Sequence, residues 1–325
     1  MVTGAAGYIG SHIVDYLIDT GHAVIGIDDF STGSRTFLNP KMKFFEGNIC
    51  DLGFLNHVFS ELGGYTDSGV IHCAGKKFPS ESVLIPSEYY AINTVGTLNL
   101  LSTMKKFNVR NLVFSSSCSV YGNSSSTAPV HEDNQVNPVS PYGRSKYFAE
   151  QIIKDETSLG WLRATSLRYF NVAGNASISA HDSSLYNLFP NILRSILDSV
   201  PFTIFGNTFA TKDGSCIRDY VDVRDLSKVH AFAMSKLLQG EELLPAYNLG
   251  SAVGYSVKEV VTRAKQLIGH ELMVLYAEPR SGDPASILAD VTFAKRDLDW
   301  SPTYNLDDMI LASWNAWLKN LSQSH

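Results

Sequence analysis

Three side chains in the first half of the chain have the types and the spacing to remove a proton and a hydride from an alcohol. Tyr142 and Lys146 stand four residues apart in Ser-Pro-Tyr-Gly-Arg-Ser-Lys, and Ser117 ends the upstream run Asn-Leu-Val-Phe-Ser-Ser-Ser. Loss of a hydride requires a base for the hydroxyl proton, and free tyrosine titrates near pH ~10. A lysine one turn away on the same helix face favours the phenolate. The spacing therefore predicts Tyr142 as a base whose pKa Lys146 lowers.

The segment around Tyr142 has the features of a helix N-terminus. Ser140 is the expected N-cap and Pro141 the expected first residue of a helix over 140–159. Tyr142 then lies in the first turn, where the helix dipole also favours an anion. Because tyrosine–lysine pairs also occur on many solvated helix faces, this motif alone is weak evidence.

A glycine-rich string near the N-terminus suits a dinucleotide. Thr-Gly-Ala-Ala-Gly-Tyr-Ile-Gly precedes an expected helix over 11–19, and its glycines bring backbone N–H groups close to a pyrophosphate at the helix N-terminus. Glycines also cap helices and form turns. Asp28 ends the next expected strand, where a carboxylate accepts hydrogen bonds from a ribose diol and repels a 2′-phosphate, so NAD is favoured over NADP. The alternative for Asp28 is a turn-initiating acid.

The elements that must position these groups alternate along the first half of the chain. Short apolar runs at 24–28, 43–46, 70–74, 111–115 and 164–169 alternate with longer periodic runs that include 87–107 and 140–159. This pattern predicts an α/β fold with a doubly wound, Rossmann-like parallel sheet. Only Met1 and Val2 precede the glycine turn, so the first strand is expected to be very short.

The rhythm becomes irregular beyond Asn171. We therefore predict a dinucleotide-binding domain over 1–171, with returns to the sheet near 219–250, and a smaller, interleaved α/β substrate domain over 172–325.

Composition excludes several classes of protein. The 325 residues are 44% hydrophobic and 18% charged, and the net charge of −6 comes without a basic run. No nucleic-acid or membrane partner is expected. The four cysteines Cys50, Cys73, Cys118 and Cys216 and the nine histidines lack the spacing of a metal site, which predicts no metal and no disulfide. With no leader-like segment and no long apolar run, the expected location is the cytoplasm.

Six motifs taken together resemble the extended short-chain dehydrogenase/reductase family over essentially the whole chain. They are T-G-x-x-G-x-x-G, S-S-S-x-x-V-Y-G, Y-x-x-x-K, R-Y-F-N, I-F-G-N and R-D-Y. Within that family the chain is similar to the nucleotide-sugar 4-epimerases. The resemblance implies a tightly bound NAD, a UDP-hexose such as UDP-glucose or UDP-galactose as substrate, and inversion at C4 through a transient 4-keto sugar. It also implies a homodimer formed by the two long helices at 87–107 and 140–159.

The resemblance assigns roles to individual residues. Tyr142 takes the C4 hydroxyl proton, Ser117 hydrogen-bonds the reacting oxygen and Lys146 binds the nicotinamide ribose. The residues implied to contact the cofactor are Gly4, Gly7, Tyr8, Ile9, Gly10, Asp28, Asp29, Phe30, Ser31, Thr32, Asn48, Ile49, Cys73, Ala74, Gly75, Lys77, Ser117, Tyr142, Lys146 and Phe170. Those implied to contact the UDP-sugar are Asn171, Asn187, Leu188, Thr203, Ile204, Phe205, Arg218, Tyr220, Arg280, Asp283 and Ile287.

Several of the substrate residues have a structural alternative. The guanidinium groups of Arg218 and Arg280 match phosphate oxygens, but both arginines are equally compatible with surface salt bridges. Asn171 and Asn187 are also typical turn and cap residues, and Phe205 is typical of a core.

The chain also departs from the family pattern. Asn48 replaces an aspartate that accepts from adenine, and Ile92 replaces an asparagine that contacts the cofactor, so we expect looser NAD retention. Ile287 replaces a bulky tyrosine near the hexose, which makes activity on UDP-N-acetyl sugars an expected secondary activity. The loop at 175–185 lacks the usual acidic Gly-Glu-Asp pattern.

Two rival functions are tested by residue type. A nucleotide-sugar 4,6-dehydratase or decarboxylase carries carboxylic acids directly after the catalytic hydroxyl, whereas this chain has Cys118 and Ser119. Chemistry should therefore stop at C4. A non-catalytic NAD-binding protein commonly loses the tyrosine or the lysine, and both are present. UDP-N-acetylglucosamine and UDP-pentoses remain alternative substrates.

Overall fold

The computed structural model describes residues 1–61, 67–123, 128–176, 180–280 and 283–323. Its largest element is a seven-stranded sheet in the order β10-β6-β5-β4-β1-β2-β3, in which every pair of neighbours is parallel. The strands are β1 Val2–Thr3, β2 Ile25–Asp28, β3 Lys43–Glu46, β4 Val70–His72, β5 Asn111–Ser117, β6 Arg163–Tyr169 and β10 Ala246–Leu249. The strand order reverses between β1 and β4, which is where ligands bind in doubly wound sheets. The predicted fold class is confirmed.

The first strand is as short as expected. Val2 and Thr3 pair with β2 on one side and with β4 on the other, and both are fully buried. β5, in contrast, runs two residues further than predicted and ends at Ser117. The hydroxyl of Ser117 is therefore fixed at the carboxyl edge of the sheet.

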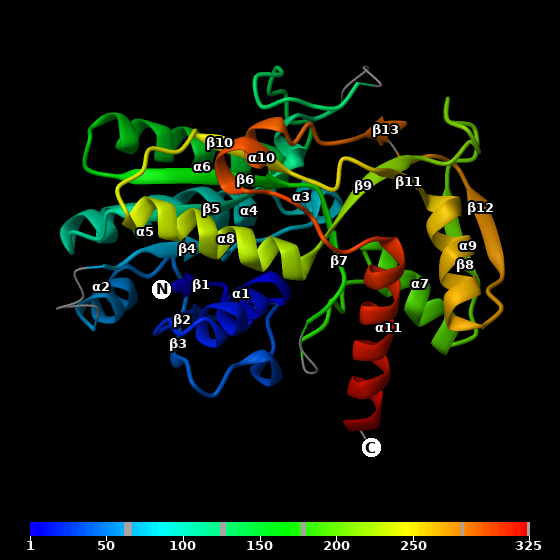
Figure 1. Cartoon of the computed structure of the whole chain (residues 1–325), viewed down its shortest axis with the longest axis horizontal. Helices are drawn as coiled ribbons and strands as arrows, with labels where there is room; N and C mark the ends of the chain where they lie inside the picture. The colour runs from blue at the N-terminus through cyan, green and yellow to red at the C-terminus, as the bar shows by residue number, and fades with distance from the viewer. Residues whose placement is uncertain (62–66, 124–127, 177–179, 281–282, 324–325) are drawn as a thin grey trace.

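Helices cover both faces of the sheet (Figure 1). α1 Tyr8–Asp19 packs against α8 Val223–Leu238 on one face, and α2 Leu52–Ser60, α5 Gly96–Lys106 and α6 Pro141–Ser158 pack together on the other. Successive residues of β5 alternate between the two cores, with Val113 in one and Leu112 and Phe114 in the other. This is the side-chain alternation of a buried parallel strand.

The two long helices that carry the site differ in regularity. Ser140 caps α6 by accepting from the N–H of Gly143 at 3.1 Å, and Pro141 is its first residue, as predicted. The predicted single helix over 87–107 is instead α4 Pro86–Tyr89, a π-helical stretch η2 Tyr90–Val95 and α5. Such π-stretches frequently mark functional sites. Here η2 carries Asn93, whose side chain bonds both backbone groups of Lys76 and the hydroxyl of Ser145.

A second lobe lies at the right of Figure 1. It contains β7 Asn171–Ala173, α7 Leu188–Leu197, β8 Phe202–Phe205, β9 Ile217–Asp222, β11 Gly254–Ser256, α9 Val257–Ile268, β12 Val274–Ala277, β13 Ser286–Ile287 and α11 Leu306–Gln323. β11, β9 and β13 form one sheet, with β7 also paired to β9, and β12 pairs with β8. Because β10 and α8 return to the large sheet, the two lobes are interleaved. The remaining short elements are α3 Pro79–Leu84, α10 Thr292–Leu298, η1 Arg35–Phe37 and η3 Cys118–Val120.

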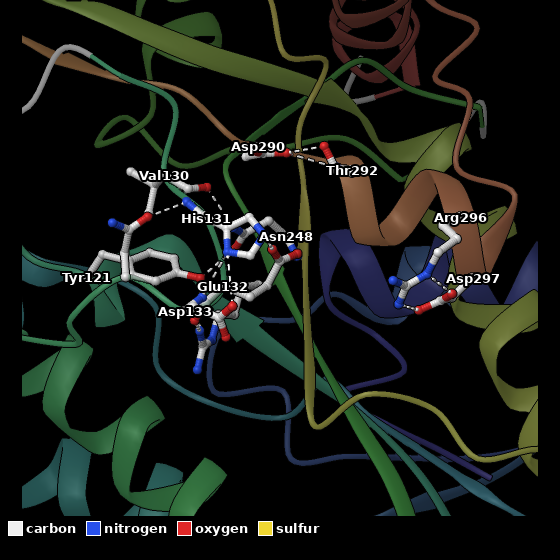
Figure 2. A network of polar contacts seen from close by, with 12 residues as sticks. Tyr121, Val130, His131, Glu132, Asp133, Asn248, Asp290, Thr292, Arg296 and Asp297 are labelled. Atoms are coloured by element: carbon white, nitrogen blue, oxygen red, sulfur yellow. Dashed lines mark hydrogen bonds and ion pairs between the residues drawn. The ribbon is translucent and has the colours of Figure 1, made fainter.

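A polar network ties the chain that follows β5 to β10 and to the segment before α10 (Figure 2). The hydroxyl of Tyr121 donates to Asn248 Oδ1 at 2.7 Å, and Asn248 Nδ2 donates to the carbonyl of Val130 at 2.8 Å. The N–H of Asn248 donates to Glu132 Oε1 at 2.7 Å, and Val130 forms a β-bridge with Ala289. These bonds connect Tyr121, four residues beyond Ser117, and the segment 130–132 to β10.

Among the described residues, none of the helices combines the length and apolar character needed to cross a bilayer. Within the same residues, no group of three or more His, Cys, Asp or Glu side chains is arranged to hold a metal.

Candidate active site

The three predicted catalytic residues come together at the carboxyl edge of the sheet. Ser117 ends β5, and Tyr142 and Lys146 lie on the first two turns of α6. All three side chains are buried, and the hydroxyl of Ser117 donates to the hydroxyl of Ser119 at 3.2 Å. Tyr142 lines two adjoining cavities. A base at this position reaches ligands in both.

Burial, rather than the lysine, controls the protonation of Tyr142. Loss of solvation raises the pKa of Tyr142 to about 12, and the neighbouring hydroxyl of Ser117 lowers it by less. The ammonium of Lys146 donates to the carbonyl of Ser115 at 2.9 Å and lies 4.8 Å from the ring centre of Phe114. The prediction that Lys146 lowers the pKa of Tyr142 is therefore wrong for the protein without its cofactor. Burial also lowers the pKa of Lys146 to about 8.

The first cavity, of about 460 Å³, is built on the glycine-rich turn. A side chain on Gly10 would lie 2.0 Å from the carbonyl oxygen of Gly4, and one on Gly4, at φ +71°, would lie 2.7 Å from the backbone nitrogen of Ala74. A side chain on Gly7 would meet only the carbonyl oxygen of Gly4, at 3.3 Å. Gly4 and Gly10 thus permit the tight turn, whereas Gly7 leaves its outer side open. An open backbone turn at the start of α1 fits a pyrophosphate.

Asp28 organises this turn. Its carboxylate oxygens accept from the N–H groups of Ala6 at 2.9 Å and of Phe30 at 2.8 Å, and burial raises its pKa. Because each carboxylate oxygen can accept more than one hydrogen bond, Asp28 serves the turn and remains able to accept from a ribose. The turn-forming and ribose-binding interpretations are therefore compatible, and the cavity fits the dinucleotide that the sequence predicts.

Most of the predicted cofactor residues line this first cavity: Gly4, Gly7, Tyr8, Ile9, Gly10, Asp28, Asp29, Ser31, Thr32, Asn48, Ile49, Cys73, Ala74, Gly75, Lys77, Tyr142 and Lys146. Ser117 and Phe170 line the adjoining one. Phe30 is not among the residues that line either cavity. Its ring packs on Phe44 and under the guanidinium of Arg35.

The two departures from the family pattern both lie at the first cavity. Ile92, on the π-stretch, lines it as an apolar side chain. Asn48 donates from Nδ2 to Asp29 at 2.7 Å and accepts the N–H of Cys50 at Oδ1 at 2.8 Å. The amide of Asn48 is thus already used within the protein, although its oxygen can accept a second bond.

The second cavity, of about 380 Å³, lies between the large sheet and the second lobe. Every predicted substrate residue except one lines it: Asn171, Asn187, Leu188, Thr203, Ile204, Phe205, Arg218, Tyr220, Arg280 and Asp283. The exception is Ile287, which pairs with Arg218 in the β9–β13 register and lies in the hydrophobic core. In the predicted loop over 175–185, residues 177–179 lie outside the described residues.

Two arginines give the second cavity its cationic character. Arg218 is mostly buried, donates to the carbonyl of Pro284 at 2.8 Å and pairs with Asp283 at 3.4 Å. The guanidinium of Arg280 lies 4.2 Å from the ring centre of Phe205. Asn187 occupies the N-cap of α7, but its side chain does not cap the helix. Arginines, an aromatic ring and an amide that does not cap its helix, all around one cavity, suit a nucleoside diphosphate.

Sequence reasoning missed several residues of the two cavities. Tyr169 and Tyr186 each line both, and the stretch 181–185 lines the first. Tyr169 directly precedes Phe170 in the R-Y-F-N motif, so that motif was an available signal. Residues 180–187 form no helix or strand, and their sequence contains no motif that would have predicted a position beside the cavities.

A Rossmann-like sheet with two adjoining cavities and a Ser–Tyr–Lys set defines a dinucleotide-binding α/β protein of the short-chain dehydrogenase/reductase type. The chain belongs to the NAD dependent epimerase/dehydratase family, whose model matches residues 1–250. The resemblance expected from the motifs is thereby confirmed.

Named relatives match the chain over nearly its full length. It is 38% identical to a UDP-glucose 4-epimerase of Lactobacillus helveticus, over 98% of this chain and 97% of that protein. A crystal structure of UDP-glucose 4-epimerase from Stenotrophomonas maltophila, with bound NAD and formylated UDP-arabinopyranose, superposes with a TM-score of 0.92 at 32% identity and covers 100% of this chain and 98% of that one. The enzyme from Bifidobacterium longum, in complex with NAD+ and UDP, superposes with a TM-score of 0.90 at 34% identity and covers 98% of each chain.

Proposed function

We propose that this protein is an NAD-dependent epimerase that inverts C4 of a UDP-hexose and interconverts UDP-glucose and UDP-galactose. The observation that carries the proposal is the position of Tyr142, which lies beside Ser117 where a dinucleotide cavity adjoins a cationic cavity. The relatives named above, solved with NAD and with UDP or a UDP-sugar, support it.

The residues divide the reaction between them. Tyr142, as phenolate, takes the C4 hydroxyl proton while Ser117 holds the reacting oxygen, and Tyr142 later returns the proton. The glycine-rich turn, Asp28 and Lys146 would hold NAD, which would supply a reversible acceptor for the C4 hydride and a positive charge that favours the phenolate. Arg218 and Arg280 hold the diphosphate. The intermediate is a 4-keto sugar that presents its other face before reduction.

The residues beside Ser117 argue against elimination. Cys118 and Ser119 line the second cavity, and burial raises the pKa of the Cys118 thiol to about 12. Neither side chain is a carboxylic acid, which elimination would require as an acid and base at C5 and C6 of the sugar. The proposed chemistry therefore stops at C4.

A homodimer is part of the proposal. Exposed apolar side chains lie on the two long helices, with Val95 48%, Leu98 43% and Phe148 43% exposed. Phe148 stacks on Tyr90 at 6.0 Å across those helices. Substituting Leu98→Glu should halve the mass measured by light scattering; a parent protein that is already monomeric would refute the dimer. The cytoplasmic location and a role in galactose metabolism stay predictions.

Proton NMR of UDP-glucose incubated with the purified protein, without added cofactor, tests the proposal. UDP-galactose should appear and reach a constant ratio, because the NAD purified with the protein would be regenerated in every turnover. UDP-N-acetylglucosamine and UDP-xylose in parallel samples rank the sugars. No conversion by folded protein that contains NAD would refute the proposed function.

A further inference from the structure

The stretch 181–187 forms a wall shared by the two cavities. Residues 181–186 line the dinucleotide cavity, Asn187 lines the substrate cavity, and Tyr186 lines both. Their position makes this stretch the place where one ligand site can influence the other.

Asp182 connects residues from both cavities. Its side chain is only 10% exposed. Oδ2 accepts from Nδ2 of Asn187 at 2.6 Å, and Oδ1 accepts the N–H of Ser184 at 3.2 Å and lies 3.6 Å from Nζ of Lys77. The backbone carbonyl accepts from the indole of Trp317 on α11 at 3.1 Å. The carboxylate of Asp182 thus contacts Lys77, which lines the dinucleotide cavity, and Asn187, which lines the substrate cavity.

These contacts orient Lys77 and Asn187 for ligands. A lysine ammonium has three N–H donors, so one directed at Asp182 leaves two for anionic oxygens in the cavity. The amide of Asn187, which does not cap α7, has Nδ2 committed to Asp182. That bond fixes the orientation of the amide and leaves its oxygen and second N–H for a ligand. Orienting both side chains in advance lowers the entropy lost on binding.

Aromatic contacts hold the same stretch against the chain that carries Lys77. The rings of Tyr186 and Phe78 lie 4.9 Å apart at 37°, and Nζ of Lys77 lies 5.4 Å from the ring centre of Phe78. Charge and ring contacts therefore tie the stretch to the edge of the dinucleotide cavity.

Ser184 supplies an independent observation. Its hydroxyl is buried at the wall of the dinucleotide cavity and has no hydrogen-bond partner in the part of the chain that the structure describes. Buried hydroxyls are normally paired, because an unpaired one costs free energy. A polar atom of the dinucleotide is the partner that this cavity would provide.

We propose that Asp182 is a positioning residue that couples cofactor binding to UDP-sugar binding, and that the Ser184 hydroxyl binds the dinucleotide. This inference rests on the proposed function. Asp182 contacts both Asn187 and Lys77, so a ligand that orders one of these side chains also orders the carboxylate that positions the other. The coupling is therefore favourable, and because coupling between sites is reciprocal, each ligand strengthens the binding of the other. UDP in the second cavity therefore slows the loss of NAD from the first.

The rate of NAD release tests this coupling. NAD-loaded protein is diluted and ultrafiltered with and without saturating UDP, and the free dinucleotide is measured over time. In the parent protein UDP should slow release by about 5-fold or more. Asp182→Asn should release NAD faster and lose the UDP effect, because Lys77 and Asn187 no longer share a carboxylate. Ser184→Ala should release NAD about 3- to 10-fold faster and keep the UDP effect.

Two further variants separate coupling from general disruption. Asp198→Asn breaks a surface pair with Arg194, which is 2.9 Å long, and should behave as the parent does. Asn187→Ala leaves the Lys77–Asp182 pair intact, so it should lose the UDP effect without speeding release in the absence of UDP. It also keeps the proposal testable if Asp182→Asn does not fold.

A UDP effect of parental size in both Asp182→Asn and Asn187→Ala would overturn the coupling. Parental NAD release by Ser184→Ala would overturn the role of its hydroxyl. Neither readout requires turnover. If UDP slows NAD release as described but no sugar is epimerised, the proposed function fails while this inference stands.

Discussion

Substituting Lys146→Met should make the NAD-depleted protein more stable at pH 7 while abolishing its activity. Lys146 is buried, and its surroundings lower the pKa of its ammonium from 10.5 to about 8. The charged form is therefore disfavoured in the folded protein. Methionine has a similar length, carries no charge and retains apolar contact with Phe114, over whose ring the ammonium now lies.

The magnitude follows from this pKa. At about 1.4 kcal/mol for each factor of ten in proton affinity, the charged lysine costs about 3 kcal/mol below pH 8. Loss of its hydrogen bond to the carbonyl of Ser115, which is 2.9 Å long, offsets about 1–2 kcal/mol. The net gain is about 1–2 kcal/mol, which corresponds to a rise in Tm of about 2–4 °C.

The sign of the pH dependence identifies the cause. Between pH 8 and 10.5 the unfolded parent binds more protons at Lys146 than the folded parent does, so the parent gains stability as pH rises. Thermal melts of the two proteins at pH 7 and pH 9.5 should therefore show a Tm difference that shrinks at the higher pH. A variant that is less stable than the parent at pH 7, or a difference that is constant with pH, would refute this reasoning.

Four other substitutions test the site. Tyr142→Phe should lower turnover about 10²- to 10⁴-fold with little change in UDP affinity by calorimetry, and near-parental turnover would exclude the phenol as the base. Gly10→Ala should destabilise the fold, because its methyl would lie 2.0 Å from the carbonyl oxygen of Gly4. Gly7→Ala, whose methyl would lie 3.3 Å from the same oxygen, should fold but bind less NAD. Thermal melts and the NAD content of the purified proteins distinguish the two variants, and full NAD content in Gly7→Ala would contradict pyrophosphate binding on the open side of the turn. Asn48→Asp places a carboxylate against Asp29, whose Oδ2 now accepts from the Asn48 amide at 2.7 Å, so it should lower the stability of the NAD-depleted protein by about 0.5–1 kcal/mol. It should also slow NAD release, because it restores a charged acceptor for adenine; unchanged release would contradict the looser retention expected from Asn48.

Local sequence rules predicted the elements that carry the chemistry. The cap at Ser140 and the proline after it located α6 to within a residue, and the glycine spacing located the turn before α1. α1 begins at Tyr8, three residues earlier than predicted, because Gly7 takes the extended N-cap conformation. These features depend on neighbours in the sequence, which explains why a sequence alone reveals them.

Features that depend on the assembled sheet were not predictable. The spacing of Tyr142 and Lys146 indicated a shared helix face, but the ammonium bonds Ser115 on a neighbouring strand and burial raises the pKa of the phenol. The π-stretch at 90–95 is stabilised in part by Asn93, whose partners lie elsewhere in the chain. Ile287 was expected near the sugar, but its place in the β9–β13 pairing directs it into the core.

The central claim is that the hydride removed from C4 returns to the same carbon while Tyr142 moves only the proton. UDP-glucose carrying deuterium at C4 tests it, with the UDP-galactose formed by NAD-loaded protein in ordinary water examined by proton NMR and mass spectrometry. The account predicts that the product retains deuterium at C4. Product that carries protium at C4 would contradict it, because the hydrogen would then have exchanged with water.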